Sequence, residues 1–187
     1  MRPDITTLLD ACRQGEASAR EQLYERIYAE LKRIARGTLR RSGPQLTISP
    51  STLVHEVFLR LAGQDQQSLE SSRHFYSLVA CAMRQIVIDL GRRLATAKHG
   101  AGLRRVEMTD GLDLGGVALD ALLELDHALR HLHDCDAELA ELVEWHFFAG
   151  LSFAEIGLLR GVTERTVRRH WETARIFLCD ALPADAG

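Results

Sequence analysis

The segment that most restricts the fold of this chain is LSFAEIGLLRGVTERTVRRHWETARIFL, residues 151–178. Ser152 is followed three positions later by Glu155, which is the spacing of a capping box at the start of a helix. The apolar face of this first helix consists of Phe153, Ile156, Leu158 and Leu159. Gly161 stands where a residue with positive φ would end the helix. The pattern therefore predicts a short helix followed by a turn over residues 160–162.

A second helix is predicted directly after this turn, with Thr163 as its N-cap. Its apolar residues recur at steps of four, three and four, the spacing of one buried stripe: Val167, Trp171, Ala174 and Leu178. Two short helices joined in this way are the DNA-binding helix-turn-helix, whose second helix enters the major groove. We expect Arg165, Arg168 and Arg169 to read bases or bind phosphates. The alternative is an ordinary helical hairpin whose arginines are merely solvated.

The rest of the chain also carries helical patterns and predicts an all-α protein. Gly15 separates two helices near the N-terminus. Ser49 and Pro50 open another helix as its cap and its first residue. The apolar face of that helix is Leu53, Val54, Val57, Phe58 and Leu61.

A long helix is predicted from about residue 73 to residue 93, with Phe75, Leu78, Val79, Ala82, Ile86 and Leu90 on its core face. Residues 96–118 are rich in glycine and lack sustained periodicity, so we interpret them as a flexible linker. Helices over 119–132 and 137–148 then lead into the helix-turn-helix. The prediction is two small helical domains joined by a tether.

Charge is divided unevenly along the chain, although the formal net charge is only −3. Residues 32–105 hold 13 Lys and Arg against four acids, a net of +9, whereas residues 106–163 hold twelve acids and two arginines, a net of −10. Because the field at a DNA backbone is local and screened beyond about 10 Å, an acidic protein can still bind nucleic acid. One hypothesis is that the two domains pack together in the free protein, with the acidic residues 107–144 covering the basic surfaces.

Other function classes find little support. No apolar run reaches the roughly 20 residues of a membrane span and the N-terminus lacks the apolar core of a signal peptide, so we expect a cytoplasmic protein without a membrane partner. His127, His131 and Cys135 have a spacing that can bind zinc, but a fourth ligand is absent, and we expect no metal. The sequence contains no phosphate loop, nucleophile elbow or paired carboxylates, so we expect neither catalysis nor a cofactor.

In their order along the chain, these segments resemble the group 4 sigma factors of bacterial RNA polymerase, the extracytoplasmic-function (ECF) type of the sigma-70 family. The sigma-2-like pieces are LLDACRQGEASAREQLYERIY, LVHEVFLRL at 53–61 and FYSLVACAMRQIVIDLGRR at 75–93. The sigma-4-like piece is residues 142–175. The resemblance implies a sigma-2-like domain over residues 1–95, a linker over 96–118 and a sigma-4-like domain over 119–187. It also implies core RNA polymerase and promoter DNA as partners, while any anti-sigma factor stays unidentified.

The resemblance assigns a role to each surface. The sigma-4-like domain would hold the minus 35 element of a promoter with Thr163, Glu164, Arg165, Thr166, Arg168 and Arg169. The long helix would bind the melted minus 10 element through Arg73, His74, Tyr76, Arg84, Arg92 and Arg93. For His74 and Tyr76 the alternative is packing within the protein. The expected contacts to the clamp helices of the largest polymerase subunit are Leu53, Glu56 and Arg60.

One segment departs from the family pattern. Group 4 sigma factors usually carry several carboxylates just before the LVHEVFLRL helix, and these dock on the basic clamp helices. The aligned positions here are Ser49, Ser51 and Thr52, and Glu56 is the only acid left on the helix. A phosphate on Ser51 or Thr52 would restore about −1.5 to −2 charge at a helix N-terminus.

We therefore predict that a Ser/Thr kinase activates the protein at this segment, with Thr52 favoured slightly over Ser51 and with Ser49 as a third candidate. The alternative is that Ser49 caps the helix and the other hydroxyls are merely tolerated in its first turn.

A different class of function also fits the helix-turn-helix, namely a stand-alone transcriptional regulator whose N-terminal domain senses a ligand or mediates dimerisation. The net charge of +9 over residues 32–105 favours the sigma factor, because a sensor domain needs no such basic surface. Binding of the protein alone to duplex promoter DNA separates the two, since a sigma factor needs core polymerase and a repressor does not.

Overall fold

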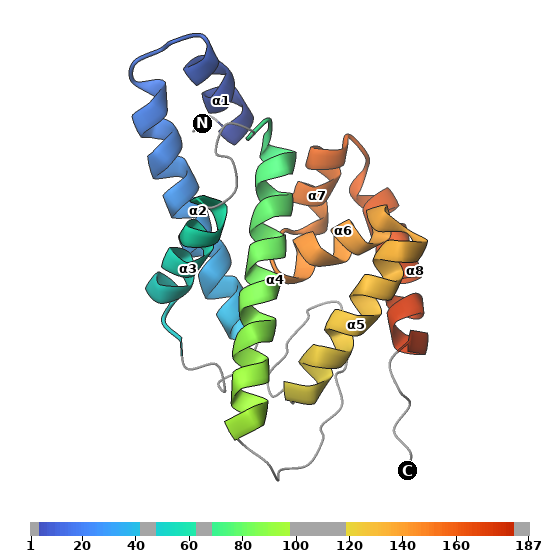
Figure 1. The fold of residues 1–187 in the computed structure, drawn as a ribbon. Coiled ribbons are helices and arrows are strands. Elements are labelled where there is room, and N and C mark those ends of the chain that lie inside the picture. Colours follow the sequence, from blue (N-terminus) through green and yellow to red (C-terminus); the bar gives the residue numbers. More distant parts are fainter. Residues whose placement is uncertain (1–3, 42–47, 63–68, 98–118, 182–187) are drawn as a thin grey trace.

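The computed structural model describes residues 4–41, 48–62, 69–97 and 119–181, and within them all regular structure is helical. The prediction of an all-α protein is confirmed (Figure 1). The helices are α1 (Ile5–Arg13), α2 (Ala19–Arg41), α3 (Pro50–Ala62), α4 (Ser72–Ala97), α5 (Leu119–Cys135), α6 (Ala137–Phe147), α7 (Phe153–Arg160) and α8 (Glu164–Ala181).

Local capping signals account for where the first helices begin and end. The side chain of Asp4 accepts a hydrogen bond from the backbone N–H of Thr7 at 2.7 Å and so caps α1. Gly15 adopts a φ of 81° between α1 and α2, as predicted for the break there, because glycine tolerates this left-handed conformation. At α3 the backbone N–H of Thr52 donates to Oγ of Ser49 at 3.1 Å. Ser49 is therefore the N-cap of α3, as predicted.

Helix α4 is the central element of the fold. Figure 1 shows it between α2 and α3 on one side and α5, α6 and α7 on the other, and it packs against helices of both groups. It is longer than the predicted helix over 73–93 and includes residues 96 and 97 of the predicted linker. The remaining linker residues, 98–118, lie outside the described part of the chain.

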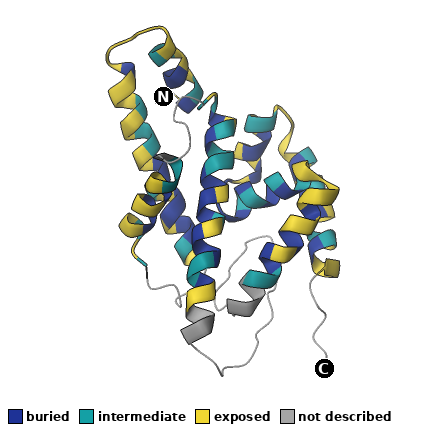
Figure 2. Cartoon of the chain, viewed as in Figure 1, coloured by how far each residue is buried: buried dark blue, intermediate teal, exposed yellow. Residues whose placement is uncertain are grey.

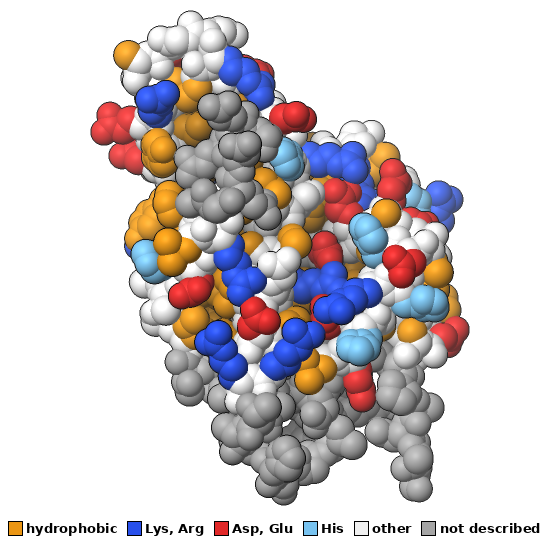
Figure 3. All heavy atoms as spheres, in the orientation of Figure 1, with side chains coloured by type: hydrophobic (Ala, Val, Ile, Leu, Met, Phe, Trp, Pro, Cys, Tyr) orange, Lys and Arg blue, Asp and Glu red, His pale blue; other side chains and the backbone are white. Residues whose placement is uncertain are grey.

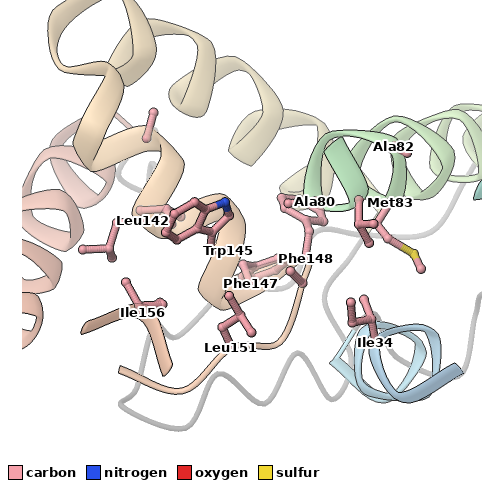
Figure 4. Packing of buried hydrophobic residues seen from close by; sticks show 14 of the residues in the cluster. Ile34, Ala80, Ala82, Met83, Leu142, Trp145, Phe147, Phe148, Leu151 and Ile156 are labelled. Atoms are coloured by element: carbon pink, nitrogen blue, oxygen red, sulfur yellow. The ribbon is translucent and has the colours of Figure 1, made fainter. Parts of the chain in front are cut away.

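One hydrophobic core joins the two halves of the chain, and buried residues line both sides of α4 (Figure 2). Figure 4 shows Ile34 of α2 and Met83 of α4 near Phe148, which follows α6. Phe148 and Trp145 are both fully buried. The buried hydroxyl of Thr38 donates to the carbonyl oxygen of Phe148 at 2.7 Å. The segments predicted to form separate domains are thus in close contact in this structure.

The helix-turn-helix matches its prediction closely. Both hydrogen bonds of the capping box between Ser152 and Glu155 are present at the start of α7. Gly161 ends α7 with a φ of 67°, and the N–H of Thr166 donates to the hydroxyl of the Thr163 cap at 3.2 Å. The buried residues of α8 are the four of the predicted stripe, Val167, Trp171, Ala174 and Leu178.

Two apolar residues that were predicted to face the core lie on the surface instead. Leu158 of α7 is 84% exposed, because Phe153, Ile156 and Gly157 supply the buried side of this short helix. Phe58 of α3 is 42% exposed. In both helices the apolar pattern is broader than the face that neighbouring helices cover.

Candidate nucleic-acid interface

The exposed face of α8 carries the residues predicted to contact the minus 35 element. Arg165 and Arg169 are exposed, and among the described residues neither has an ion pair. Arg168 differs, because its guanidinium donates to Oε1 of Glu164 at 2.7 and 3.0 Å and lies 5.0 Å from the ring centroid of Phe153. Thr163 and Thr166 pair their hydroxyls at the start of the helix.

Aromatic packing fixes α8 against the rest of the helix-turn-helix. The ring of His146 in α6 stacks on Phe153 of α7 with centroids 4.4 Å apart and meets the edge of Trp171 in α8 at 4.9 Å. A hydrogen bond of 2.7 Å between Nδ1 of His146 and the carbonyl oxygen of Leu151 holds this ring in place. Because one imidazole contacts both helices of the motif, the arginine-bearing face of α8 has a defined orientation.

Most arginines predicted to bind the minus 10 element contact carboxylates of α5 and α6. Arg84 of α4 is the most enclosed, with its side chain 13% exposed. Its Nε donates to Oδ1 of Asp126 at 2.9 Å, its second amine donates to the carbonyl oxygen of Asp126 at 2.9 Å, and its first amine pairs with Glu144. The guanidinium is therefore surrounded by three oxygens from the C-terminal half of the chain.

Two other arginines of α4 share this environment. Arg73 donates to Oε2 of Glu141 in α6 at 2.9 Å. Arg92 lies 3.6 Å from Oδ2 of Asp126. Figure 3 shows basic and acidic side chains interleaved over the face where α4 and α5 meet. Arg93 is exposed at the C-terminal part of α4 and has interactions of its own.

The acidic side of this contact lies on α5 and α6. Glu138, Glu141 and Glu144 form one stripe at helical spacing on α6. Glu141 and Glu144 face α4, and of the three only Glu138 is exposed. Asp126 is 4% exposed and also pairs with Arg130 at 2.6 Å. The sequence shows only that a basic segment precedes an acidic one. These charges predict attraction between the two segments, but not which residues pair.

Tyr76, predicted to stack on an unpaired base, points into a network of hydrogen bonds. Its hydroxyl donates to Oε1 of the buried Glu30 at 2.9 Å. The same carboxylate accepts hydrogen bonds from Arg33 at 2.7 Å and from Arg26 at 3.2 Å. The ring of Tyr76 lies edge-on to Phe75 with centroids 5.2 Å apart. In this arrangement the ring packs within the protein, the alternative that the sequence left open.

The charges in this network shift two pKa values in opposite directions. Burial opposes ionisation of Glu30, but the hydrogen bonds and charges of Arg33, the Tyr76 hydroxyl and Arg26 outweigh it, so the pKa of Glu30 is lowered. Burial and the adjacent Glu30 carboxylate raise the pKa of Tyr76. Glu30 is therefore a charged residue that links α2 to α4.

His74, another residue predicted to bind the minus 10 element, also has a contact within the protein. Its Nδ1 accepts a hydrogen bond from the backbone N–H of Glu70 at 3.4 Å.

The predicted polymerase contacts on α3 occupy different environments. Leu53 is fully buried and belongs to the core. Arg60 is bound within the protein, donating to Asp89 at 2.7 Å and to Gln85 at 2.9 Å. Glu56 is exposed. Of the three predicted contacts, only Glu56 is exposed, and among the described residues no arginine pairs with its carboxylate.

The hydroxyls at the start of α3 are accessible. Ser51 and Thr52 are exposed in its first turn. Oγ1 of Thr52 lies 2.8 Å from Oγ of Ser49, so these two hydroxyls share a hydrogen bond. Ser49 is committed to capping, whereas Ser51 projects from the helix with no side-chain hydrogen bond within the described residues.

An exposed apolar surface on α2 and α3 was missed from the sequence. It consists of Tyr24, Tyr28, Phe58 and Leu59, which are between 42% and 56% exposed. Residues of α2 and Phe58 of α3 line an open pocket of about 340 Å³ there. The signal was present, because aromatic residues on α2 exceed what one buried stripe requires, but the sequence does not reveal which face stays uncovered.

Comparison with known proteins adds one match. The family model described as "ECF sigma factor" matches residues 2–183 of the chain. No curated protein and no solved structure matches it. In the described residues no helix is both long and apolar enough to cross a membrane, and no group of three or more potential metal ligands comes together.

Proposed function

The chain belongs to the ECF sigma factor family, and from that membership we propose how its surfaces recruit RNA polymerase and recognise a promoter. Sigma factors give core polymerase its promoter specificity, and catalysis belongs to the polymerase. The proposed sigma-2-like domain is the predicted 1–95, extended by the end of α4 to residue 97, and the proposed sigma-4-like domain is residues 119–187, with the linker between them. The observation that carries the proposal is the family match over residues 2–183.

Recognition of the minus 35 element is assigned to α8. Arg165 and Arg169 are exposed beside its N-terminal turn, where a recognition helix meets base edges. Arg168 is held by Glu164 and Phe153, so it is suited to a fixed phosphate contact. Arginine side chains bind guanine edges bidentately, which makes the two unpaired ones the candidate base readers.

Recognition of the minus 10 element is assigned to the basic face of α4. Arg73, Arg84 and Arg92 lie along that helix, and a basic groove is what tracks the backbone of a single strand. Their present carboxylate partners must be released before DNA can occupy the same positions.

Binding of core polymerase is assigned to the surface that α2 and α3 share. Exposed aromatic and aliphatic side chains are typical anchors of protein interfaces, and Tyr24, Tyr28, Phe58 and Leu59 supply them here. Glu56 adds one carboxylate at the same surface. Because the serines and Thr52 stand where family members carry acids, this surface lacks the charge needed to pair with the basic clamp helices.

Phosphorylation of Thr52 or Ser51 by a Ser/Thr kinase supplies the missing charge. Both hydroxyls are exposed in the first turn of α3, where the helix dipole and free backbone N–H groups favour an anion. Ser49 is the less suitable acceptor, since its hydroxyl caps the helix. A phosphate at either of the other positions keeps this cap and adds acceptor oxygens for polymerase arginines.

The test measures binding of purified core polymerase and run-off transcription by the wild type, Thr52→Asp, Ser51→Asp and Thr52→Ala. Charge-assisted hydrogen bonds contribute about 1.5–3 kcal/mol, so an aspartate at the modified position should tighten binding about tenfold or more. Ser18→Asp is the matched control, because it adds the same charge at an exposed site before α2. Strong binding by unmodified wild type would contradict the phosphorylation step and leave the sigma assignment standing. Absence of run-off transcription from every form, including the protein treated with kinase, would contradict the sigma assignment itself.

A further inference from the structure

We propose that Asp126 and Glu144 form an autoinhibitory latch that occupies the basic face of α4 until polymerase separates the two halves of the chain. The inference rests on the proposed function, because it takes that face as the site for single-stranded promoter DNA. It adds a closed state in which the carboxylates of α5 and α6 take the place of DNA phosphates.

The contacts of Arg84 with Asp126 and Glu144 are the main evidence for the latch. The side chain of Arg84 is 13% exposed, and its guanidinium is bound by the side chain and carbonyl oxygen of Asp126 and by Glu144. A guanidinium presents five N–H donors in a planar fork that fits a phosphate as well as carboxylates. In the closed state each of the three guanidinium nitrogens is bound to a protein oxygen, so the fork of this arginine is not available to a DNA strand.

The occupied positions extend along most of α4. From Arg73, which binds Glu141, to Arg92, which approaches Asp126, the helix advances 19 residues, or roughly 28 Å at 1.5 Å per residue. A single strand tracking this face would meet carboxylates near its start, middle and end. Carboxylates therefore contact this face near both ends and at its centre, while Arg73 and Arg92 stay about half exposed.

Stability alone does not explain the presence of these charges at a packed interface. Burying an ion pair costs desolvation that its Coulomb energy often fails to offset, and apolar residues of similar size commonly serve stability better. The same interface already has apolar and neutral polar contacts, such as Trp145, whose Nε1 donates to Ser77 at 3.1 Å. Arginines whose burial is unfavourable in the closed state are expected where they have another role in the open state. Binding of DNA by α4 is such a role.

The apolar contacts also explain why opening needs a partner. Separating α4 from α6 would expose Trp145 and Phe148, which are fully buried. Such exposure is unfavourable in water, so DNA that competes only for the arginines gains little. Polymerase, by binding both halves of the chain in separate places, can hold the open state and make the face of α4 available.

The test uses the full chain and a fluorescently labelled single-stranded DNA oligonucleotide as the probe. Asp126→Asn/Glu144→Gln removes two latch charges with little change of shape. The apparent affinity of a site scales with the fraction of molecules in the competent state. We expect the double variant to bind the oligonucleotide about tenfold more tightly than wild type, which corresponds to about 1.4 kcal/mol. Its radius of gyration in solution scattering should increase.

A matched control removes the same charge elsewhere. Asp134→Asn/Glu138→Gln neutralises two exposed carboxylates of α5 and α6 that have no ion pair with α4 in the described residues. Its affinity should stay within about twofold of wild type, because only general charge repulsion changes. If the double latch variant does not fold by circular dichroism, Glu144→Gln alone should still bind about threefold more tightly.

The outcomes separate the latch from the proposed function. Equal affinities and radii for the latch variant and its control would overturn the latch, even with normal run-off transcription by core polymerase. Tighter DNA binding and expansion of the latch variant, with no run-off transcription by any form, would support the latch and overturn the sigma assignment.

Discussion

Replacing Glu30 by Gln should measure how much one buried carboxylate contributes to joining α2 and α4. The side chain of Glu30 is 6% exposed and accepts from Arg33, Arg26 and the hydroxyl of Tyr76. Glutamine keeps the shape but presents an uncharged amide, whose NH₂ group would face arginine donors. The substitution therefore removes the charge while leaving the surrounding packing unchanged.

The expected loss of stability follows from the exposure of the partners. Removing one member of a buried ion pair costs about 3–5 kcal/mol when the other is left without water. Here Arg33 is 42% and Arg26 33% exposed, so both can regain solvent, and we expect a loss of about 2 kcal/mol. For a chain of this size that corresponds to a fall in Tm of roughly 4–8 °C.

The effect should depend on pH in a defined direction. The pKa of Glu30 is lowered in the folded protein, so the unfolded chain binds its proton more readily. The stabilisation is complete above the unfolded value of about 4.3 and is lost as pH falls through the lower folded value. The difference between wild type and Glu30→Gln should therefore be full at pH 7 and shrink below about pH 4.

Urea unfolding followed by tryptophan fluorescence at stepped pH measures these quantities. Glu25→Gln on the exposed side of α2 is the matched control and should change stability by less than about 0.5 kcal/mol. A double-mutant cycle with Tyr76→Phe should give a coupling energy of about 1 kcal/mol. A loss equal to that of Glu25→Gln, or one that persists unchanged at pH 3, would refute the reasoning.

Three further outcomes are expected around the helix-turn-helix. Gly157→Ala should lower unfolding free energy in urea by about 1 kcal/mol or more, because a Cβ there would lie 2.8 Å from the backbone oxygen of Val162 and the strain exceeds the gain in helix propensity. Ser152→Ala removes the capping box and should cost about 1 kcal/mol in the same assay, and no change would show that the cap is dispensable. Arg169→Ala should weaken promoter binding by the polymerase holoenzyme about tenfold in a footprinting titration, while Arg175→Ala, whose side chain pairs with Glu172, should stay within about twofold; equal losses would contradict base reading by Arg169.

The helix-turn-helix could be derived from the sequence because its determinants are local. The bonds between Ser152 and Glu155, the left-handed Gly161 and the stripe that includes Trp171 all depend on residues within a few positions of one another. The all-helical class followed in the same way from periodicity and capping along the chain. Local rules of this kind do not require knowledge of the neighbouring elements.

Exposure of individual side chains could not be derived in this way. Leu158 and Phe58 fit the apolar faces of their helices, yet both are exposed. Periodicity locates the centre of an apolar face, whereas its width depends on how much of it another helix covers. The apolar surface around Tyr24 and Tyr28 escaped prediction for the same reason.

The partners of the α4 arginines were decided only by the tertiary structure. Charge counts placed a basic segment before an acidic one, but Arg84 meets Asp126 across 42 positions and Glu144 across 60. Coulomb attraction has little directional preference, so it cannot select these pairs from a sequence; packing of α5 and α6 on α4 selects them. The sequence thus identifies the candidate DNA-binding arginines, while their accessibility depends on how the two halves of the chain are arranged.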